Sequence, residues 1–234
     1  MPKLSIIIPC YNEAKNLPAL FKKLEVLESN KIEIILINNG STDNTYSILS
    51  KEIKKKKYFK FISIKKNIGY GHGIMSGINA ASGEIIAWTH ADLQTDPKDV
   101  LDAYSNYIKY SDYKFRILKG RRVGRQFSEL FFTNGMSLIS SFLLGFKLDD
   151  INAQPKIFHK SFIKLMKNAP NDFTLDLYFL YLAKVNGYKI IEYPVYFNQR
   201  LYGYSKGGGS FFGKIKLIIH TFFYIIKLNK TIWN

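Results

Sequence analysis

The chain has 234 residues, of which 47% are hydrophobic and 22% charged, a balance typical of a globular protein rather than a disordered one. Its length suits one domain with a tail better than two full domains. The net charge of +16 suggests an anionic partner, which could be a nucleic acid, a phosphorylated substrate or an acidic lipid surface. No recognised nucleic-acid-binding motif is present, so we do not expect nucleic acid to be the partner.

The single cysteine, Cys10, excludes an internal disulfide and a zinc site built from cysteines, and it fits a reducing compartment. The chain opens directly on a strand-like run at residues 4–8, with nothing that resembles a signal peptide. No uncharged apolar run approaches the ~20 residues of a membrane-spanning helix. These features predict a protein that is made and kept in the cytosol.

Short isoleucine-rich runs alternate with segments of helical spacing in the first half of the chain. The runs predict strands at residues 4–8, 32–37, 59–64 and 84–88. Apolar residues at helical spacing predict a helix between the first two strands, over residues 17–27. Such an alternation indicates an α/β fold with a mostly parallel sheet.

The second half is less regular. It predicts strands at 115–118, 156–158 and 190–197, and helices at 129–144, 173–185 and 211–228. Residues 201–210 are rich in glycine and predict a mobile loop. We find no internal repeat, and we expect one domain over residues 1–210 followed by a C-terminal amphipathic helix over 211–234.

Polar clusters follow three of the predicted strands, at residues 9–13 (PCYNE), 38–43 (NNGSTD) and 90–92 (HAD). In sheets of this kind ligands bind beyond the carboxyl ends of the strands, so the clusters predict a ligand site. The two asparagines of the second cluster can offer an acceptor and a donor to a pyrimidine edge. The alternative is that Ser41 or Thr42 only caps the helix that follows.

A glycine-rich turn, Gly69-Tyr-Gly-His-Gly73, precedes another predicted helix. It differs from the dinucleotide fingerprint G-x-G-x-x-G and follows the third strand rather than the first, which argues against a Rossmann site. Two interpretations stay open: the turn holds a diphosphate on its amide groups, or its glycines only pack the helix against the sheet.

Four motifs, taken in order, resemble the family-2 glycosyltransferases of the GT-A fold. They are SIIIPCYNE at 5–13, NGSTD at 39–43, N-x-G-x-G at 67–71 and ADLQ at 91–94. The resemblance continues through Gly120-Arg121, DINAQP at 150–155 and R-x-x-G-x-S-K at 200–206, as in the branch that includes dolichol- and polyprenyl-phosphate sugar transferases. It implies a GT-A domain with a mostly parallel central sheet and helices on both faces.

The resemblance also implies a nucleotide-sugar donor and a divalent metal, Mn²⁺ or Mg²⁺. Asp92 would hold the metal on the diphosphate, with His90 and Gln94 beside it. The expected donor-binding residues are Pro9, Tyr11, Glu13, Asn39, Asp43, Gly69 and Gly71.

Two departures from the family pattern bear on this site. Family members usually carry aspartates where this chain has Asn38 and Asn39, and another where it has His90. An asparagine keeps an acceptor for the base, whereas His90 removes a negative charge from a site whose metals prefer oxygen ligands. Three roles are open to His90: a direct metal ligand, a hydrogen-bond partner of the ribose or diphosphate, or a filler of the strand end.

The chemistry of the acceptor decides which other groups the reaction needs. A hydroxyl acceptor requires a general base, for which Asp176 is the first candidate and Asp172 the second. A phosphate acceptor is already ionised at neutral pH, because its second pKa is about 6, and needs cations instead. The candidate cations are Arg121, Arg122, Arg125, Arg200 and Lys206, and for Arg122 and Arg125 a solvated surface role is nearly as well supported.

The C-terminal segment suggests where an acceptor is met. Residues 217–226 are apolar except for His220 and Thr221, and lysines flank them on both sides. A run of about 10 residues cannot span a bilayer, but it could lie in the interface with its lysines on anionic headgroups. A buried or dimer-forming helix is the alternative.

These features together predict an inverting glycosyltransferase at the inner face of the membrane that moves a sugar from a nucleotide donor, expected to be UDP-linked, to a polyprenyl phosphate. One alternative is a transferase of the same fold that acts on a sugar hydroxyl of a glycan or lipid-linked intermediate. Another is a noncatalytic nucleotide-sugar-binding protein that lost its metal site with the change at His90.

Overall fold

The computed structural model describes residues 2–124, 127–203 and 211–232. Within these ranges, residues 127–134, 211, 214 and 229–232 are described by their backbone alone. Its described strands form one seven-stranded sheet in the order β3-β2-β1-β4-β6-β5-β7. β6 runs antiparallel to both of its neighbours, and the other neighbouring pairs are parallel. The strands are β1 (Leu4–Cys10), β2 (Ile32–Asn39), β3 (Phe59–Ile64), β4 (Ile85–Trp88), β5 (Arg116–Val123), β6 (Lys156–His159) and β7 (Lys189–Tyr196).

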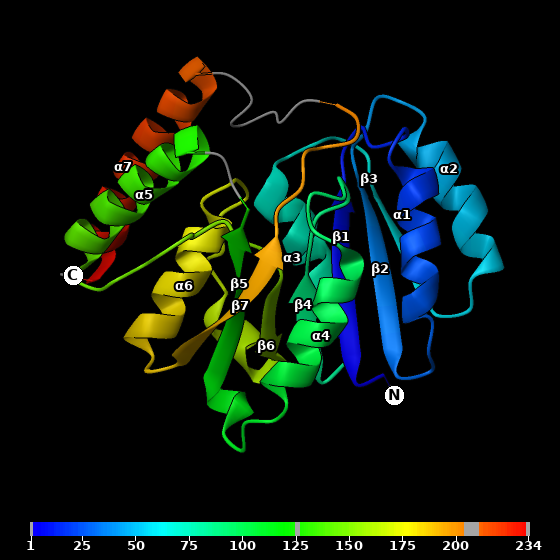
Figure 1. The fold of residues 1–234 in the computed structure, drawn as a ribbon, viewed down its shortest axis with the longest axis horizontal. Coiled ribbons are helices and arrows are strands. Elements are labelled where there is room, and N and C mark those ends of the chain that lie inside the picture. Colours follow the sequence, from blue (N-terminus) through cyan, green and yellow to red (C-terminus); the bar gives the residue numbers. More distant parts are fainter. Residues whose placement is uncertain (1, 125–126, 204–210, 233–234) are drawn as a thin grey trace.

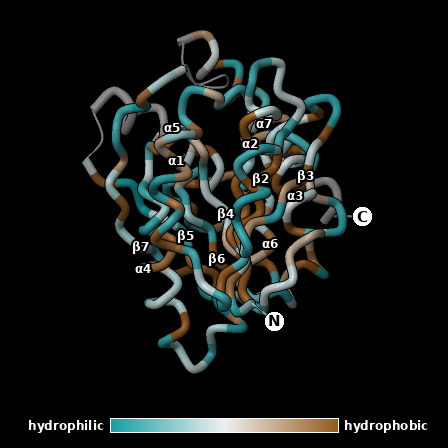
Figure 2. The backbone as a smooth tube through the Cα atoms, turned by 90° about the vertical axis from the view of Figure 1, so that its right-hand side faces the viewer, coloured by the Kyte–Doolittle hydropathy of each residue, from teal (hydrophilic) through white to brown (hydrophobic). Residues whose placement is uncertain are grey.

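Helices cover both faces of the sheet because successive side chains of a strand point to opposite sides. Ile6 and Ile8 of β1 pack in the same cluster as α1 (Leu17–Leu24), α2 (Thr45–Glu52) and α4 (Pro97–Tyr107). Ile7 packs on the other side with α3 (Tyr70–Ala80) and α6 (Leu175–Val185). Short 3-10 helices lie at Glu25–Leu27, Ile53–Lys55, Tyr113–Phe115 and Lys160–Leu165. Figure 2 shows the hydrophobic residues gathered along the strands and much of the surrounding loop backbone hydrophilic.

Two long helices lie outside this arrangement. α5 (Phe127–Leu144) and α7 (Phe211–Ile232) run side by side at the edge of the molecule, beyond α6 (Figure 1). Ile225 of α7 is buried in the core cluster of α6, while Phe223 of α7 and Phe142 of α5 are exposed. No helix in the part of the chain that the structure describes has the length and apolar character needed to cross a membrane.

The predicted α/β fold with a mostly parallel sheet and all of the predicted strands are confirmed, with small shifts at the strand ends, and the amphipathic character of the C-terminal helix stays a prediction. The N-cap prediction for Ser41 or Thr42 is wrong, because α2 begins at Thr45. Both hydroxyls are used elsewhere: Ser41 Oγ accepts a hydrogen bond from the backbone amide of Asn12 (3.0 Å), and Thr42 Oγ1 accepts one from the Asn12 side chain (3.2 Å). Of the predicted loop 201–210, residues 204–210 lie outside the described part of the chain, and Lys206 with them.

Candidate active site

The first two polar clusters meet at the carboxyl ends of β1 and β2, which are neighbours in the sheet. The backbone amide of Glu13 donates to Thr45 Oγ1 (2.8 Å), and that of Ala14 donates to Asp43 Oδ2 (3.2 Å). Asn12 has a positive φ of 57°, and its side-chain oxygen accepts from the Thr42 amide (2.8 Å). These bonds fasten the two loops to each other, so that Glu13 and Asp43 keep fixed positions at one edge of the site.

The two adjacent asparagines have different surroundings. Asn38 uses both ends of its side chain internally, since Oδ1 accepts from the Ser41 amide and Nδ2 donates to Ser63 Oγ (both 3.2 Å). Asn39 is 3% exposed, and its Nδ2 donates to the carbonyl oxygen of Gly69 (3.0 Å). Among the described residues the Oδ1 of Asn39 has no hydrogen-bond partner. Asn39 Oδ1 is therefore a buried acceptor that is left without a partner among the described residues, whereas both ends of the Asn38 side chain are used.

The glycine-rich turn opens α3 as predicted, with Gly69 just before the helix. A Cβ atom on Gly69 would lie 2.1 Å from the carbonyl oxygen of Asn171, and one on Gly71 would lie 2.2 Å from that of Pro170. The His72 amide also donates to Asn171 O (3.0 Å). The loop around Asn171 thus covers the start of α3, so Gly69 and Gly71 admit this loop rather than the sheet that the packing interpretation named, and diphosphate binding by the two glycines stays a prediction.

Asp92 and Arg200 meet although 108 residues separate them. Asp92 is 4% exposed; its Oδ1 accepts from the Gln94 amide (3.1 Å) and its Oδ2 lies 2.5 Å from Arg200 Nη2. Arg200 Nη1 lies 3.9 Å from Glu13 Oε1. The backbone after β7 is held in place because the Asn198 amide donates to Gln94 O (2.8 Å). Three predicted site segments, after β1, β4 and β7, therefore converge on one cationic side chain.

The pKa of Glu13 depends on the charges around Arg200. Burial raises the pKa of the Glu13 carboxyl, and the nearby Asp92 raises it further, whereas the hydrogen bond from Asn16 and the charge of Arg200 lower it. Two carboxylates thus lie close to each other with a positive charge between them. In this structure Arg200 supplies that positive charge.

Whether these residues fit a divalent metal depends on their donor atoms. No group of three or more His, Cys, Asp or Glu side chains forms a ready metal site in the described part of the chain. Mg²⁺ and similar hard cations commonly bind through one or two carboxylates and complete their coordination with substrate phosphates and water. Asp92 and Glu13, arranged around the Arg200 guanidinium, fit that mode of binding. Gln94 Nε2 donates to the carbonyl oxygen of Asn198 (3.4 Å), and its role as a metal ligand stays a prediction.

His90 lies beside the same site in a partly buried position. Burial lowers the pKa of the imidazole, while the charges of Asp92 and Asp176 oppose that shift. The ring of Tyr70 lies 6.2 Å from the imidazole, centroid to centroid. The lowered pKa favours the neutral imidazole, the form that can ligate a metal, and the role of His90 there stays a prediction.

Asp176, the first candidate for a general base, is 2% exposed and forms an internal ion pair. Its Oδ1 accepts from Lys156 Nζ and from Gln154 Nε2, each at 2.9 Å. Lys156 is fully buried and also donates to the carbonyl oxygens of Ile151 (2.9 Å) and Ala153 (2.7 Å). Burial lowers the pKa of the Lys156 amine, and the charge of Asp176 opposes that shift. This arrangement gives Asp176 a structural partner that the sequence did not indicate.

Asp172, the second candidate, also has strong partners. Its Oδ1 accepts from the amide (2.9 Å) and the hydroxyl (2.6 Å) of Thr174, and its Oδ2 lies 2.7 Å from His220 Nε2 of α7. Burial raises the pKa of this carboxyl, but the hydrogen bonds from Thr174 and the bond and charge of His220 together outweigh burial, and the net pKa is lowered. A carboxylate with a lowered pKa is a weaker proton acceptor.

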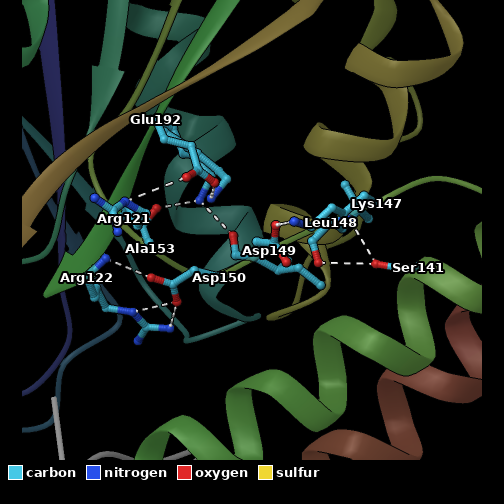
Figure 3. Close-up of polar contacts among 12 residues, drawn as sticks. Arg121, Arg122, Ser141, Lys147, Leu148, Asp149, Asp150, Ala153 and Glu192 are labelled. Atoms are coloured by element: carbon cyan, nitrogen blue, oxygen red, sulfur yellow. Dashed lines mark hydrogen bonds and ion pairs between the residues drawn. The ribbon is translucent and has the colours of Figure 1, made fainter.

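Two of the cations predicted to bind phosphate, Arg121 and Arg122, lie at the end of β5 (Figure 3). Arg122 is not a solvated surface charge: its Nε donates to Asp150 Oδ1 (2.9 Å), and its guanidinium lies 5.1 Å from the centre of the Phe197 ring. Arg121 is 55% exposed and lies 3.7 Å from Glu192. Arg125 lies outside the described residues, as Lys206 does.

Sequence reasoning missed the buried charges behind the site. Lys119 of β5 and Lys156 of β6 are directly opposite each other in the antiparallel pair, and both are almost fully buried. Lys119 pairs with Glu192 of β7 (2.7 Å), its neighbour on the other side. A lysine inside a short apolar strand was the available signal, but which carboxylate it meets depends on the order of the strands.

Relatives and solved structures resemble this chain over most of its length. It is 26% identical over 211 residues to the undecaprenyl-phosphate 4-deoxy-4-formamido-L-arabinose transferase of Photorhabdus laumondii, covering 87% of this chain and 62% of that protein. The enzyme of the same name from Enterobacter sp. is 26% identical over 212 residues, with the same coverage. The chain therefore spans about three fifths of the length of the curated relatives it matches.

The fold matches glucosyl-3-phosphoglycerate synthase of Mycobacterium tuberculosis, solved with Mn²⁺, uridine diphosphate and glucosyl-3-phosphoglycerate (TM-score 0.71, 13% identity, 96% of this chain and 78% of that one). It also matches a mannosyltransferase of Pyrobaculum calidifontis solved with GDP-Man and Mn²⁺ (TM-score 0.64, 21% identity, covering 89% of this chain and 59% of that one). At these identities the likeness establishes the GT-A type of fold. The model for glycosyl transferase family 2 matches residues 5–168, more than half of the sequence, and this chain belongs to that family.

Proposed function

We propose that this protein transfers a sugar from a UDP-linked donor to a polyprenyl phosphate, with inversion at the anomeric carbon. The observation that carries the proposal is the convergence of Asp92, Glu13 and Arg200 at the carboxyl ends of the strands, where α/β sheets bind their ligands. The relatives named above are transferases that act on undecaprenyl phosphate.

The donor half of the site is built around the nucleoside and the diphosphate. Asn39, at the carboxyl end of β2, would lie beside the base of the donor. Arg200 presents a guanidinium whose parallel N–H groups match two oxygens of the diphosphate. Pro9, near the end of β1, and Tyr11, just after that strand, would line the nucleoside.

A divalent metal, Mn²⁺ or Mg²⁺, would be held by Asp92 with Glu13 and Gln94 nearby, and would neutralise the charge that develops on the leaving diphosphate. The solved structures of similar fold contain Mn²⁺. Asp92 supports this assignment because it is buried, lies beside a cation and follows the end of β4. Metal dependence is part of the proposal.

The acceptor half favours a phosphate over a hydroxyl. An acceptor phosphate oxygen forms a bond to the anomeric carbon as the bond from that carbon to the diphosphate oxygen breaks, and no proton has to be removed. A hydroxyl would need a base, yet Oδ1 of Asp176 already accepts from Lys156 and Gln154. Arg121, exposed at the end of β5, would meet the acceptor phosphate.

The outer helices support a membrane location for this reaction. Exposed apolar side chains lie on both helices of the α5 and α7 pair, and we propose that this surface rests on an anionic bilayer with the flanking lysines on the headgroups. The exposed members are Leu138, Ile139, Phe142, Phe212, Ile219, Phe222 and Phe223. A polyprenyl chain would then stay in the lipid while its phosphate reaches the site.

The test measures transfer with saturating donor to a polyprenyl phosphate and, separately, to a simple glycoside. We expect Asp92→Asn to abolish transfer and Arg121→Ala to reduce it, each lost charge-assisted contact costing about 2 kcal/mol. Arg116→Ala is the matched control, because Arg116 pairs with Asp112 at the opposite end of β5. Transfer to the glycoside alone would favour a hydroxyl acceptor, and donor binding without transfer to either would favour a binding protein.

A further inference from the structure

We propose that Arg200 and the divalent metal are alternative partners of Asp92, so that the donor diphosphate admits the metal by drawing Arg200 away. This inference rests on the proposed function, since it assigns an order to the binding of its metal and its donor. It makes Arg200 a residue that determines when the metal binds, in addition to its contact with phosphate.

The first observation is that both oxygens of Asp92 are engaged. Oδ1 accepts from the Gln94 amide (3.1 Å), and Oδ2 holds Arg200 Nη2 at 2.5 Å. The carboxylate is 4% exposed, so few directions of approach are open to it. A metal bound at Oδ2 would lie against the guanidinium, and two cations in contact repel each other strongly in a partly buried site.

The second observation is that the backbone around Arg200 is anchored while its side chain is partly exposed. The backbone around it is anchored on both sides, by Asn198 bonded to Gln94 (2.8 Å) and by the Tyr202 carbonyl, which accepts from Asn16 Nδ2 (3.4 Å). The arginine side chain is 23% exposed, and its second contact, to Glu13, is looser at 3.9 Å. Rotation of one long side chain is enough to free Asp92.

The donor diphosphate would replace Asp92 as the partner of Arg200. The contact of Arg200 with Asp92 uses one nitrogen of the guanidinium, whereas a diphosphate offers several oxygens that match the parallel N–H groups of the fork. Diphosphate binding would therefore move the arginine and, at the same time, add oxygen ligands for the metal. Metal and nucleoside diphosphate should each strengthen the binding of the other by the same factor.

The experiment measures Mn²⁺ binding to the full chain, from the paramagnetic resonance signal of free Mn²⁺, with and without UDP. We expect the wild type to bind Mn²⁺ weakly alone and more tightly with UDP. Arg200→Gln should bind Mn²⁺ alone about tenfold more tightly than the wild type, and UDP should then improve that binding less. Arg116→Gln, which removes the same charge at the far end of β5, should behave as the wild type, and Asp92→Asn should lose Mn²⁺ binding in all conditions.

Arg200→Lys distinguishes competition between the side chain and the metal from damage to the loop that carries residue 200. Lysine keeps the positive charge but lacks the parallel N–H groups of the guanidinium. The variant should bind Mn²⁺ alone as weakly as the wild type while gaining less from UDP. Equal or weaker binding of Mn²⁺ alone by a folded Arg200→Gln would overturn the inference and leave the proposed function intact. A wild type that binds neither Mn²⁺ nor UDP, alone or together, would overturn both.

Discussion

Replacing Lys156 with methionine should destabilise the protein by about 3–5 kcal/mol, because it leaves Asp176 buried without its counter-ion. Lys156 is 0% exposed, Asp176 is 2% exposed, and their charged atoms lie 2.9 Å apart. At an effective dielectric constant of about 20, the attraction over this distance is about 6 kcal/mol, which offsets the cost of removing both charges from water. Asp176→Leu should cost a similar amount, since it leaves the ammonium group of Lys156 buried and uncompensated.

The double variant distinguishes an ion pair from two independent contributions. Methionine and leucine together replace the pair with apolar groups of similar volume, so the double variant should lie within about 2 kcal/mol of the wild type, far from the sum of the single changes. Urea unfolding followed by circular dichroism measures all four free energies of unfolding. Additive single effects, or a Lys156→Met cost below about 1 kcal/mol, would refute the view that Asp176 is held as a buried ion.

Three further predictions concern the site and its supports. Burial lowers the folded-state pKa of His90 below that of the unfolded chain, so the free energy of unfolding should fall as pH decreases below about 6.5, and urea titrations of His90→Asn should show a flatter dependence. Gly71→Ala should lower the midpoint of thermal unfolding, because the added Cβ would lie 2.2 Å from a backbone carbonyl oxygen. Gly135→Ala is the control and should raise the midpoint slightly, because its Cβ would meet nothing within 4 Å. Equal midpoints for the two variants would contradict a packing role for Gly71. Phe223→Asp should weaken flotation with anionic liposomes, and Tyr46→Asp, an exposed aromatic on α2, should not; unchanged flotation of Phe223→Asp would argue against the membrane surface on α7.

The sequence by itself determined the layered α/β architecture and most of the candidate site. The isoleucine-rich runs and the helical spacing between them report which faces are buried, and that information is local to each segment. Polar residues that directly follow strands were expected at the carboxyl edge for the same reason, and Glu13, Asn39 and Asp92 do lie there. Helix ends were less predictable, because Ser41 and Thr42 bond to Asn12 of another loop instead of capping α2.

Only the tertiary structure decided which charged groups meet. Arg200 reaches Asp92 because the segment after β7 is bonded to the loop after β4, and Lys156 reaches Asp176 because β6 is inserted between β4 and β5 with its lysine facing α6. A charge inside a short strand shows that a partner must exist, since an unpaired buried charge is too costly to keep. It does not identify that partner, because strand order and the path of a loop depend on contacts between residues far apart in the chain.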